Sequence, residues 1–367
     1  ALPRANAAWE HERKLGVRLQ FCYGGSNYEK EDAIVIVSLV VVVVGYLGVQ
    51  MFTSSDDAFP NHTISVNVHA GAGGGTDVWV RKMCSILEQD LGQSLNVSNV
   101  TGGSGGECVN LVSESASDGY TWLGFSESLA THVANGIHTH TTSEFDYYII
   151  GGCPGVLCVA ADSPYTTYDE FIEAAKENPG ELKVSNSGRG KLWHLKTYIA
   201  AGLGEVPLEY VPYGGSGDSI IACLNGEVTA VAASIGEIND YVKAGQLRPL
   251  VALETDSYVV GEYTVPSACD YFEVANDYYP LAQVLGIAVK TDTPQEVKDV
   301  IEAAFNTAMA SDDMKEFAEE QFGDLYGYTG AEAKEYMVSL ESKMSSLLVD
   351  LGLNQVDIEE FGIEYIG

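Results

Sequence analysis

The apolar and polar positions along the chain follow two patterns in turn, the alternation typical of a β-strand and the three-to-four-residue spacing typical of an α-helix. Residues 64–68 alternate between apolar and polar side chains, as a half-buried β-strand does, and residues 80–91 repeat apolar side chains at helical spacing until Gly92. A capping box formed by Thr167 and Glu170 predicts the start of another helix. Further strands are predicted at 94–99, 120–125, 147–151, 156–161, 183–186, 207–211, 228–233 and 247–253, and further helices at 294–308, 312–321 and 331–351.

This order of elements predicts an α/β fold. Strands that alternate with helices form largely parallel sheets with the helices packed on their faces. The chain has 367 residues, of which 46% are hydrophobic, and this suffices for a large core and, as a prior, for two domains. No internal repeat or low-complexity linker divides the sequence, so we expect two lobes between which the chain passes.

Residues 33–52 form an uncharged apolar run that is long enough to cross a bilayer as a helix. A cleaved signal peptide is the alternative, but its apolar region is usually shorter and closer to the N-terminus. We favour an uncleaved transmembrane anchor. The tail at residues 1–32 carries the basic residues near the span and is expected inside, so the rest of the chain is exported to the periplasm or the cell surface.

The charge balance argues against a nucleic-acid partner. The chain has 19 lysine and arginine residues against 52 aspartate and glutamate residues, a net charge of -33, whereas binding to phosphate backbones needs clustered basic side chains. Seven irregularly spaced cysteines are too few for a disulfide framework or a zinc site, and we expect neither metal nor cofactor. Cys153 and Cys158 flank a Pro-Gly pair and can pair, but we favour buried free thiols.

Four glycine-rich stretches occupy the same place in the predicted topology, after a strand and before a helix. They read HAGAGGGTD at 69–77, TGGSGGE at 101–107, SNSGRGK at 185–191 and YGGSGDS at 213–219. Loops at the carboxyl ends of parallel strands border the ligand crevice, and the helices that they open present free N–H groups to anions. Glycine also lets the backbone approach an anion closely. The sequence therefore predicts an anion site built largely from main chain.

Two nucleotide-binding motifs fail on these loops, and one catalytic motif remains. The Rossmann pattern fails at Thr76, where its third glycine is required, and the phosphate-binding Walker pattern fails at Leu192. Residues 102–106 do fit G-x-S-x-G, the nucleophile elbow of hydrolases, with Ser104 as the nucleophile. No arrangement of histidines marks a base for it, so a serine hydrolase at Ser104 stays open as an alternative.

The loops and their flanks resemble a known family. The segments GAGGGTDVWVR, LGQSLNVSNVTGGSGGECVN, SDGYTWLGFS, FIEAAKENPGELKVSNSGRGKLWHL, VPYGGSGDSIIACLNGEVTA and VKAGQLRPLVAL resemble, in order, the motifs of the substrate-binding proteins of tripartite tricarboxylate transporters, the Bug-type extracytoplasmic solute receptors. The resemblance covers about residues 62–351. It implies a bilobed α/β periplasmic-binding-protein fold of the second type, with two mixed or parallel-sheet lobes joined by a hinge. Lobe 1 is expected at 60–158 plus 255–367 and lobe 2 at 159–254.

The resemblance also implies a function and a set of site residues. Such a receptor closes on a small carboxylate, a di- or tricarboxylate or a similar organic acid, and delivers it to membrane permease subunits without performing chemistry. A membrane-anchored sensory or scaffold module with the same fold is the alternative. By motif position the resemblance implies ligand-binding roles for Gly74, Gly75, Thr76, Asp77, Gly103, Ser104, Gly105, Gly106, Ser126, Ser187, Gly188, Gly190, Tyr213, Gly214 and Ser234.

Four side chains in or near these loops also have simpler interpretations. Asp77 complements a helix N-terminus as readily as it faces a ligand. Arg189 and Lys191 are candidate partners for a carboxylate in so acidic a protein, but we favour exposed, solvated charges. His194 is interpreted as a packed or surface histidine rather than a ligand-binding residue.

Overall fold

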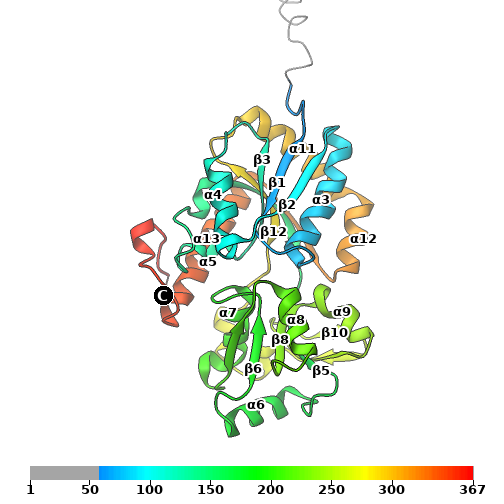
Figure 1. The fold of residues 1–367 in the computed structure, drawn as a ribbon, viewed down its shortest axis with the longest axis vertical. Coiled ribbons are helices and arrows are strands. Elements are labelled where there is room, and N and C mark those ends of the chain that lie inside the picture. Colours follow the sequence, from blue (N-terminus) through cyan, green and yellow to red (C-terminus); the bar gives the residue numbers. More distant parts are fainter. Residues whose placement is uncertain (1–57, 367) are drawn as a thin grey trace, which may run out of the picture. The chain divides into compact units, whose positions relative to one another are not determined.

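The computed structural model describes residues 58–366, which contain two mixed β-sheets with helices on their faces (Figure 1). The six-stranded sheet has the order β13-β4-β12-β3-β1-β2, with β1 (Ile64–Val68), β2 (Leu95–Asn99), β3 (Thr121–Ser126), β4 (Phe145–Gly152), β12 (Leu285–Lys290) and β13 (Asp324–Tyr328). The five-stranded sheet has the order β7-β6-β8-β5-β9, with β5 (Gly155–Ala160), β6 (Lys183–Asn186), β7 (Glu209–Pro212), β8 (Ala230–Ser234) and β9 (Leu247–Ala252). We call the parts built around these sheets lobe 1 and lobe 2.

Helices cover the faces of both sheets. Lobe 1 carries α3 (Gly75–Leu91), α4 (Gly106–Glu114), α5 (Leu129–His132), α11 (Gln295–Ala310), α12 (Asp312–Glu320) and α13 (Gly330–Asp350). Lobe 2 carries α6 (Tyr168–Glu177), α7 (Leu192–Ala200), α8 (Ser216–Leu224), α9 (Ile235–Lys243) and α10 (Ala275–Tyr278), together with a hairpin of β10 (Tyr258–Val260) and β11 (Tyr263–Val265). One apolar cluster contains side chains of both lobes, and two further clusters fill the other faces of the sheets.

The predicted helix boundaries agree with the local chemistry of the structure. Helix α3 ends at Gly92, whose φ of 63° lies in the left-handed region that favours glycine. Helix α6 begins with the predicted capping box, in which Thr167 accepts the backbone N–H of Glu170 and the Glu170 side chain returns to the backbone of Thr167. Helix starts and ends with such capping residues were therefore readable from the sequence.

The sheets are less parallel than the strand order predicted. Strand β12 runs antiparallel to both β3 and β4, and β13 runs antiparallel to β4. In lobe 2, β5 is antiparallel to β8 and β9. The chain crosses between the sheets twice. The first strand after each crossing, β5 and then β12, runs antiparallel to both of its neighbours in the sheet that it joins. The expectation of largely parallel sheets was therefore wrong for these strands, whereas mixed sheets in a bilobed fold are confirmed.

The crossings lie close to the predicted lobe boundaries but not at them. Strand β5 already belongs to the second sheet, so the first crossing falls between Gly152 and Gly155 rather than at 158. The hairpin β10–β11 packs against β9 and α9, and the chain re-enters the first sheet only at Leu285 rather than at 255. Both crossings therefore run side by side, where the backbone N–H of Cys153 donates to Gln283 Oε1 at 2.9 Å.

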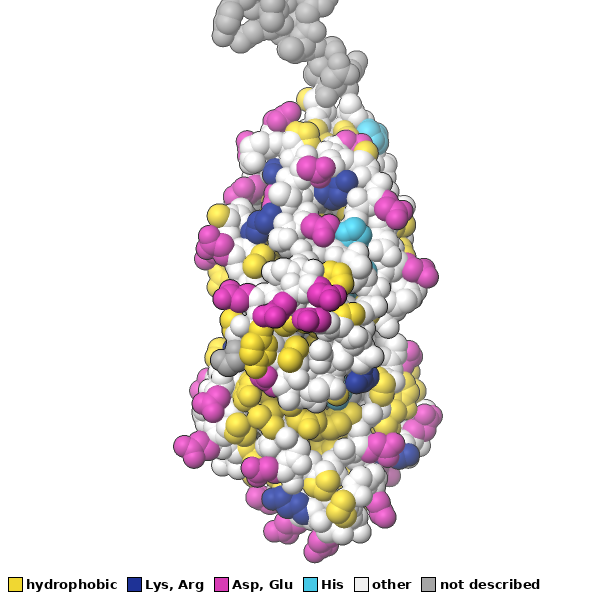
Figure 2. Space-filling view, turned by 90° about the vertical axis from the view of Figure 1, so that its left-hand side faces the viewer, with side chains coloured by type: hydrophobic (Ala, Val, Ile, Leu, Met, Phe, Trp, Pro, Cys, Tyr) yellow, Lys and Arg dark blue, Asp and Glu magenta, His cyan; other side chains and the backbone are white. Residues whose placement is uncertain are grey.

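The acidic residues and the cysteines lie in the structure much as their distribution in the sequence indicates. Carboxylates are scattered over the face shown in Figure 2 and do not form a single patch. The six cysteines among residues 58–366 are free, and all but Cys269 are buried, so no bond joins Cys153 to Cys158. No helix in this described part is long and apolar enough to cross a membrane. The predicted anchor at 33–52 and the tail at 1–32 lie outside the described residues.

Candidate functional site

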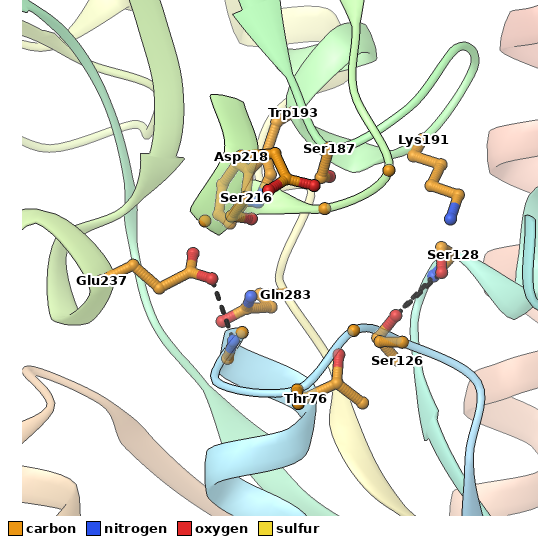
Figure 3. A pocket seen from close by; sticks show the side chains of 18 of the residues that line it. Thr76, Ser126, Ser128, Ser187, Lys191, Trp193, Ser216, Asp218, Glu237 and Gln283 are labelled. Carbon is orange, nitrogen blue, oxygen red and sulfur yellow. Dashed lines mark hydrogen bonds between the residues drawn. The ribbon is translucent and has the colours of Figure 1, made fainter. Parts of the chain in front are cut away.

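A cleft between the lobes contains two adjoining cavities of about 140 and 470 Å³. All four predicted glycine loops follow a strand and precede a helix, and each contributes to the lining of this cleft. Figure 3 shows the smaller cavity, with the start of α3 and the loop after β3 on the lobe 1 side and, on the lobe 2 side, the loops before α7 and α8 and Glu237 from the first turn of α9. The two cavities share Gly71, Ser187, Lys191, Gly214 and Asp218.

Two helix N-termini open into the smaller cavity. Helix α3 begins after Gly74 and helix α8 after Gly215, and neither of these N-cap residues makes a side-chain capping bond. The first residues of both helices line the cavity. The first N–H groups of a helix and its dipole attract anions, and at α3 the Gly75 N–H already donates to Glu237 Oε1 at 2.9 Å. The anion site predicted from main chain is therefore physically plausible, with one helix from each lobe.

The structure divides the predicted site residues into two groups. The residues that line one or both cavities are Gly74, Gly75, Thr76, Ser104, Ser126, Ser187, Gly188, Tyr213 and Gly214. The predicted residues that line neither cavity are Asp77, Gly103, Gly105, Gly106, Gly190 and Ser234. Five members of the second group are buried, whereas Gly103 is exposed and a Cβ atom there would meet nothing within 4 Å.

The side chains of Asp77 and Ser234 form hydrogen bonds to other groups of the protein. The carboxylate of Asp77 accepts the N–H of Gly73 at 2.9 Å, Arg81 Nε at 2.7 Å and Asn99 Nδ2 at 2.8 Å, so it fixes the first loop to β2. The Ser234 hydroxyl takes part in the capping box that starts α9. Both side chains are buried. Their roles in this structure are structural, as the simpler interpretation of Asp77 allowed.

The second glycine loop does not have the setting of a nucleophile elbow. Ser104 is exposed at a φ of 59°, and its carbonyl oxygen accepts Lys191 Nζ from lobe 2 at 3.4 Å. Within residues 58–366, no hydrogen bond joins the Ser104 hydroxyl to a histidine. The base that a serine nucleophile requires is therefore not in place.

Charged side chains that were not among the predicted site residues line the cleft. Lys191 is half-buried, which corrects its interpretation as a solvated charge, whereas Arg189 is exposed as expected. Burial lowers the pKa of the Lys191 ammonium, and the Glu127 carboxylate opposes this shift. Glu127 is buried, and the cost of its desolvation raises its pKa to about 7 although the N–H of Val284 donates to it at 3.1 Å. Glu237 completes this group of cavity-lining charges on the lobe 2 side.

A row of histidines lies beneath the second glycine loop. His69 Nε2 accepts the N–H of Ser126 at 2.8 Å, which places the proton of His69 on Nδ1. His138 Nδ1 accepts the N–H of His140, so His138 Nε2 donates to His132 Nδ1 at 3.1 Å and the proton of His132 lies on Nε2. Among residues 58–366, these two protonated nitrogens, His69 Nδ1 and His132 Nε2, have no hydrogen-bond partner. His69 lines the larger cavity, so its uncharged Nδ1–H donor lies beside that cavity.

This row predicts a loss of stability in acid. Burial lowers the pKa of His138 to about 4 and that of His132 well below its usual value, whereas the unfolded residues titrate near pH 6.5. The unfolded chain therefore binds more protons below pH 6.5, and the free energy of unfolding falls as the pH falls from about 6.5 towards 4. Glu127 and Glu341, with pKa values raised by burial to about 7, act in the opposite sense as the pH rises from 4.5 to 7.

Replacement of one histidine separates these contributions. In His138→Asn, the slope of the free energy of unfolding between pH 6.5 and 4.5 should be shallower by up to about 1.4 kcal/mol per pH unit, because one titrating group is lost. Urea unfolding midpoints at three pH values measure this slope. His62→Asn changes an exposed histidine and serves as the control. Equal slopes in the two variants would contradict a buried, neutral His138.

The chain matches known receptors over most of its length. Residues 79–353 match the model of the tripartite tricarboxylate transporter family receptor. A UPF0065 protein of Pseudomonas sp. strain P51 is 28% identical over 285 residues, which is 75% of this chain and 83% of that protein. Protein BugT of Bordetella pertussis is 28% identical over 209 residues, which is 55% of this chain and 64% of that protein.

Solved structures show the same fold at lower identity. A Rhodopseudomonas palustris protein solved with adipate is 21% identical, with a TM-score of 0.71 over 81% of this chain and 99% of that chain. A second R. palustris protein, MatC, solved with bound malate, is 19% identical, with a TM-score of 0.70 over 79% of this chain and 100% of that chain. Together with the family match across residues 79–353, these findings show that the chain belongs to the tripartite tricarboxylate transporter family of receptors, which bind solutes and are not enzymes.

Proposed function

We propose that this exported receptor captures a small organic acid in the cleft between its lobes and delivers it to the permease subunits of a tripartite tricarboxylate-type transporter. The observation that carries the proposal is the convergence of two helix N-termini and the Lys191 ammonium on one cavity. Free N–H groups and an ammonium at the same place favour a carboxylate. The related structures with adipate and malate support the same class of ligand.

The proposed contacts come from both lobes. In lobe 1 they are the Thr76 hydroxyl and the hydroxyl of Ser126, which lies 2.8 Å from the hydroxyl of Ser128, whereas the N–H groups of Gly74 and Gly75 already donate to the carbonyl oxygen of Gly71 and to Glu237 Oε1. In lobe 2 they are made by the loops that precede α7 and α8 and by the first two residues of α8. These residues are Ser187, Gly188, Lys191, Tyr213, Gly214, Ser216 and Gly217. A ligand that bridges the two sets stabilises the closed arrangement of the lobes.

Ligand binding should raise the stability of the receptor. A ligand at a hundred times its dissociation constant adds about 2.7 kcal/mol to the free energy of unfolding, because it binds only the folded state. Thermal melting against a panel of mono-, di- and tricarboxylates, aromatic acids and amino acids measures this effect. The corresponding neutral amides are the control. A panel in which no acid shifts the melting temperature would contradict the proposed function.

A further inference from the structure

Glu237 places a carboxylate of lobe 2 on the first glycine loop of lobe 1. Its Oε1 accepts the N–H of Gly75, the first residue of α3, at 2.9 Å, although the two residues are 162 positions apart in the sequence. Its Oε2 accepts the hydroxyl of Ser234 at 2.7 Å and the N–H of Ser234 at 3.2 Å. Figure 3 shows the side chain pointing from lobe 2 to the start of α3. The carboxylate is therefore held on both sides of the cleft.

The position of this carboxylate is one that a bound anion would take. A methyl group built on Gly75 would lie 3.5 Å from Glu237 Oε1 and 3.7 Å from Gln283 Nε2, so Glu237 packs directly against the first turn of α3. The first turn of a helix is the place where free N–H groups and the helix dipole attract negative charge. At the start of α3, the Glu237 carboxylate already holds this position.

Among residues 58–366, no side chain accepts a hydrogen bond from the first N–H groups of helix α8, although Asp218 lies in its first turn. Its N-cap residue, Gly215, makes no side-chain capping bond, and its first residues, Ser216 and Gly217, line the cavity. The Lys191 ammonium lines the same cavity. Of the starts of α3 and α8, only that of α8 has no hydrogen bond to a carboxylate from another part of the chain, and it is therefore left to receive a charged group of the ligand.

The remaining charges in the cavity act against a second ligand carboxylate. Asp218, Glu127 and Glu237 all line it, and Lys191 is the one lysine or arginine among its lining residues. A second carboxylate at α3 would either displace Glu237 from Gly75 or stand beside it. Either alternative is costly, because like charges at contact distance in a desolvated cleft repel strongly.

We propose that Glu237 makes this receptor selective for acids with a single carboxylate. The ligand carboxylate binds at the start of α8 beside Lys191, and Glu237 takes the place of a second carboxylate at α3. The other end of the ligand is uncharged and carries a hydrogen-bond donor that suits the acidic side chains around it. This inference rests on the proposed function and specifies its ligand class.

Dicarboxylates and their half-amides test the proposal, because the two members of each pair have nearly the same shape and differ by one charge. We expect succinamate and adipic acid monoamide to bind at least about tenfold more tightly than succinate and adipate, in line with the cost of like-charge contacts. In Glu237→Gln, this preference should fall to about equal affinity or reverse. Glutamine has one acceptor oxygen, so it can accept either the Gly75 N–H or the Ser234 N–H but not both. The bond from the backbone N–H of residue 237 to the Ser234 hydroxyl does not depend on this side chain, so the variant should fold.

A control variant separates the role of Glu237 from the effect of the net charge of the receptor. Glu262→Gln removes one exposed carboxylate of lobe 2 and should leave the preference unchanged, which corrects for the net charge of the receptor. Titration calorimetry of the full chain gives the affinities. If Glu237→Gln binds acids and prefers the half-amides over the dicarboxylates as strongly as the parent does, the role of Glu237 is overturned and the proposed function stands. An absence of binding by every acid in both proteins overturns the proposed function and this inference together.

Discussion

Replacement of Lys196 by methionine is expected to lower the free energy of unfolding by about 3–5 kcal/mol, the usual cost of leaving one member of a buried ion pair alone. Lys196 is fully buried in α7 and pairs with Glu254, whose side chain is only 12% exposed. The Lys196 ammonium also lies 5.7 Å from the centre of the Trp193 ring and 5.5 Å from that of Tyr279. Methionine keeps the apolar contacts of the stem but leaves the Glu254 carboxylate without its cation.

The pair is important because of where it lies. Glu254 Oε1 also accepts the N–H of Gly155 at 2.7 Å, so the ion pair fixes α7 to the first residue of β5, next to the first crossing between the lobes. Urea unfolding measures the effect of Lys196→Met. Lys315→Met, which breaks a pair of exposed residues, should cost less than about 1 kcal/mol. Addition of Glu254→Gln should restore part of the lost stability, and a loss below 1 kcal/mol in Lys196→Met would show that the pair is hydrated.

The sequence predicted the elements that carry local signals. Residues 75–91 combine helical spacing with a glycine that ends the helix, and the capping box at Thr167 is a contact between residues close in sequence. Strand β12 has no comparable signal, because it is buried on both faces and reads as a short apolar run without a period. Its place between β3 and β4 follows from contacts over more than a hundred residues, and such pairings are not encoded locally.

The site was predictable to the same extent. The glycine loops showed which backbone borders the cleft, because strand, loop and helix are consecutive in the sequence. The charged and polar side chains that meet in the cleft were not predictable in this way. Glu237, Lys191 and Gln283 come from three separate segments, and only the folded lobes bring them to one cavity. A glutamate three residues after Ser234 reads as an ordinary capping box, and nothing in that pattern indicates its second bond to Gly75.

Replacement of Gly105 by valine is expected to abolish ligand-induced stabilisation and to lower the free energy of unfolding by about 2–5 kcal/mol, from backbone strain and overpacking together. Gly105 has a φ of 99°, and a Cβ atom there would lie 2.6 Å from the carbonyl oxygen of His69 and 3.0 Å from its Nδ1. The residue lies behind the cavities, so valine acts by displacing His69 and the second loop rather than by touching the ligand.

Gly103 provides a matched control in the same loop. Its φ of 57° is equally unfavourable for valine, but a Cβ atom there meets nothing within 4 Å. Gly103→Val should therefore cost only the backbone strain, about 1–3 kcal/mol, and should keep the stabilisation by ligand. Melting temperatures of both variants with and without a bound acid make the comparison. Similar losses of stability and of ligand response in the two variants would show that the left-handed backbone, and not the contact with His69, fixes the second loop against the cleft.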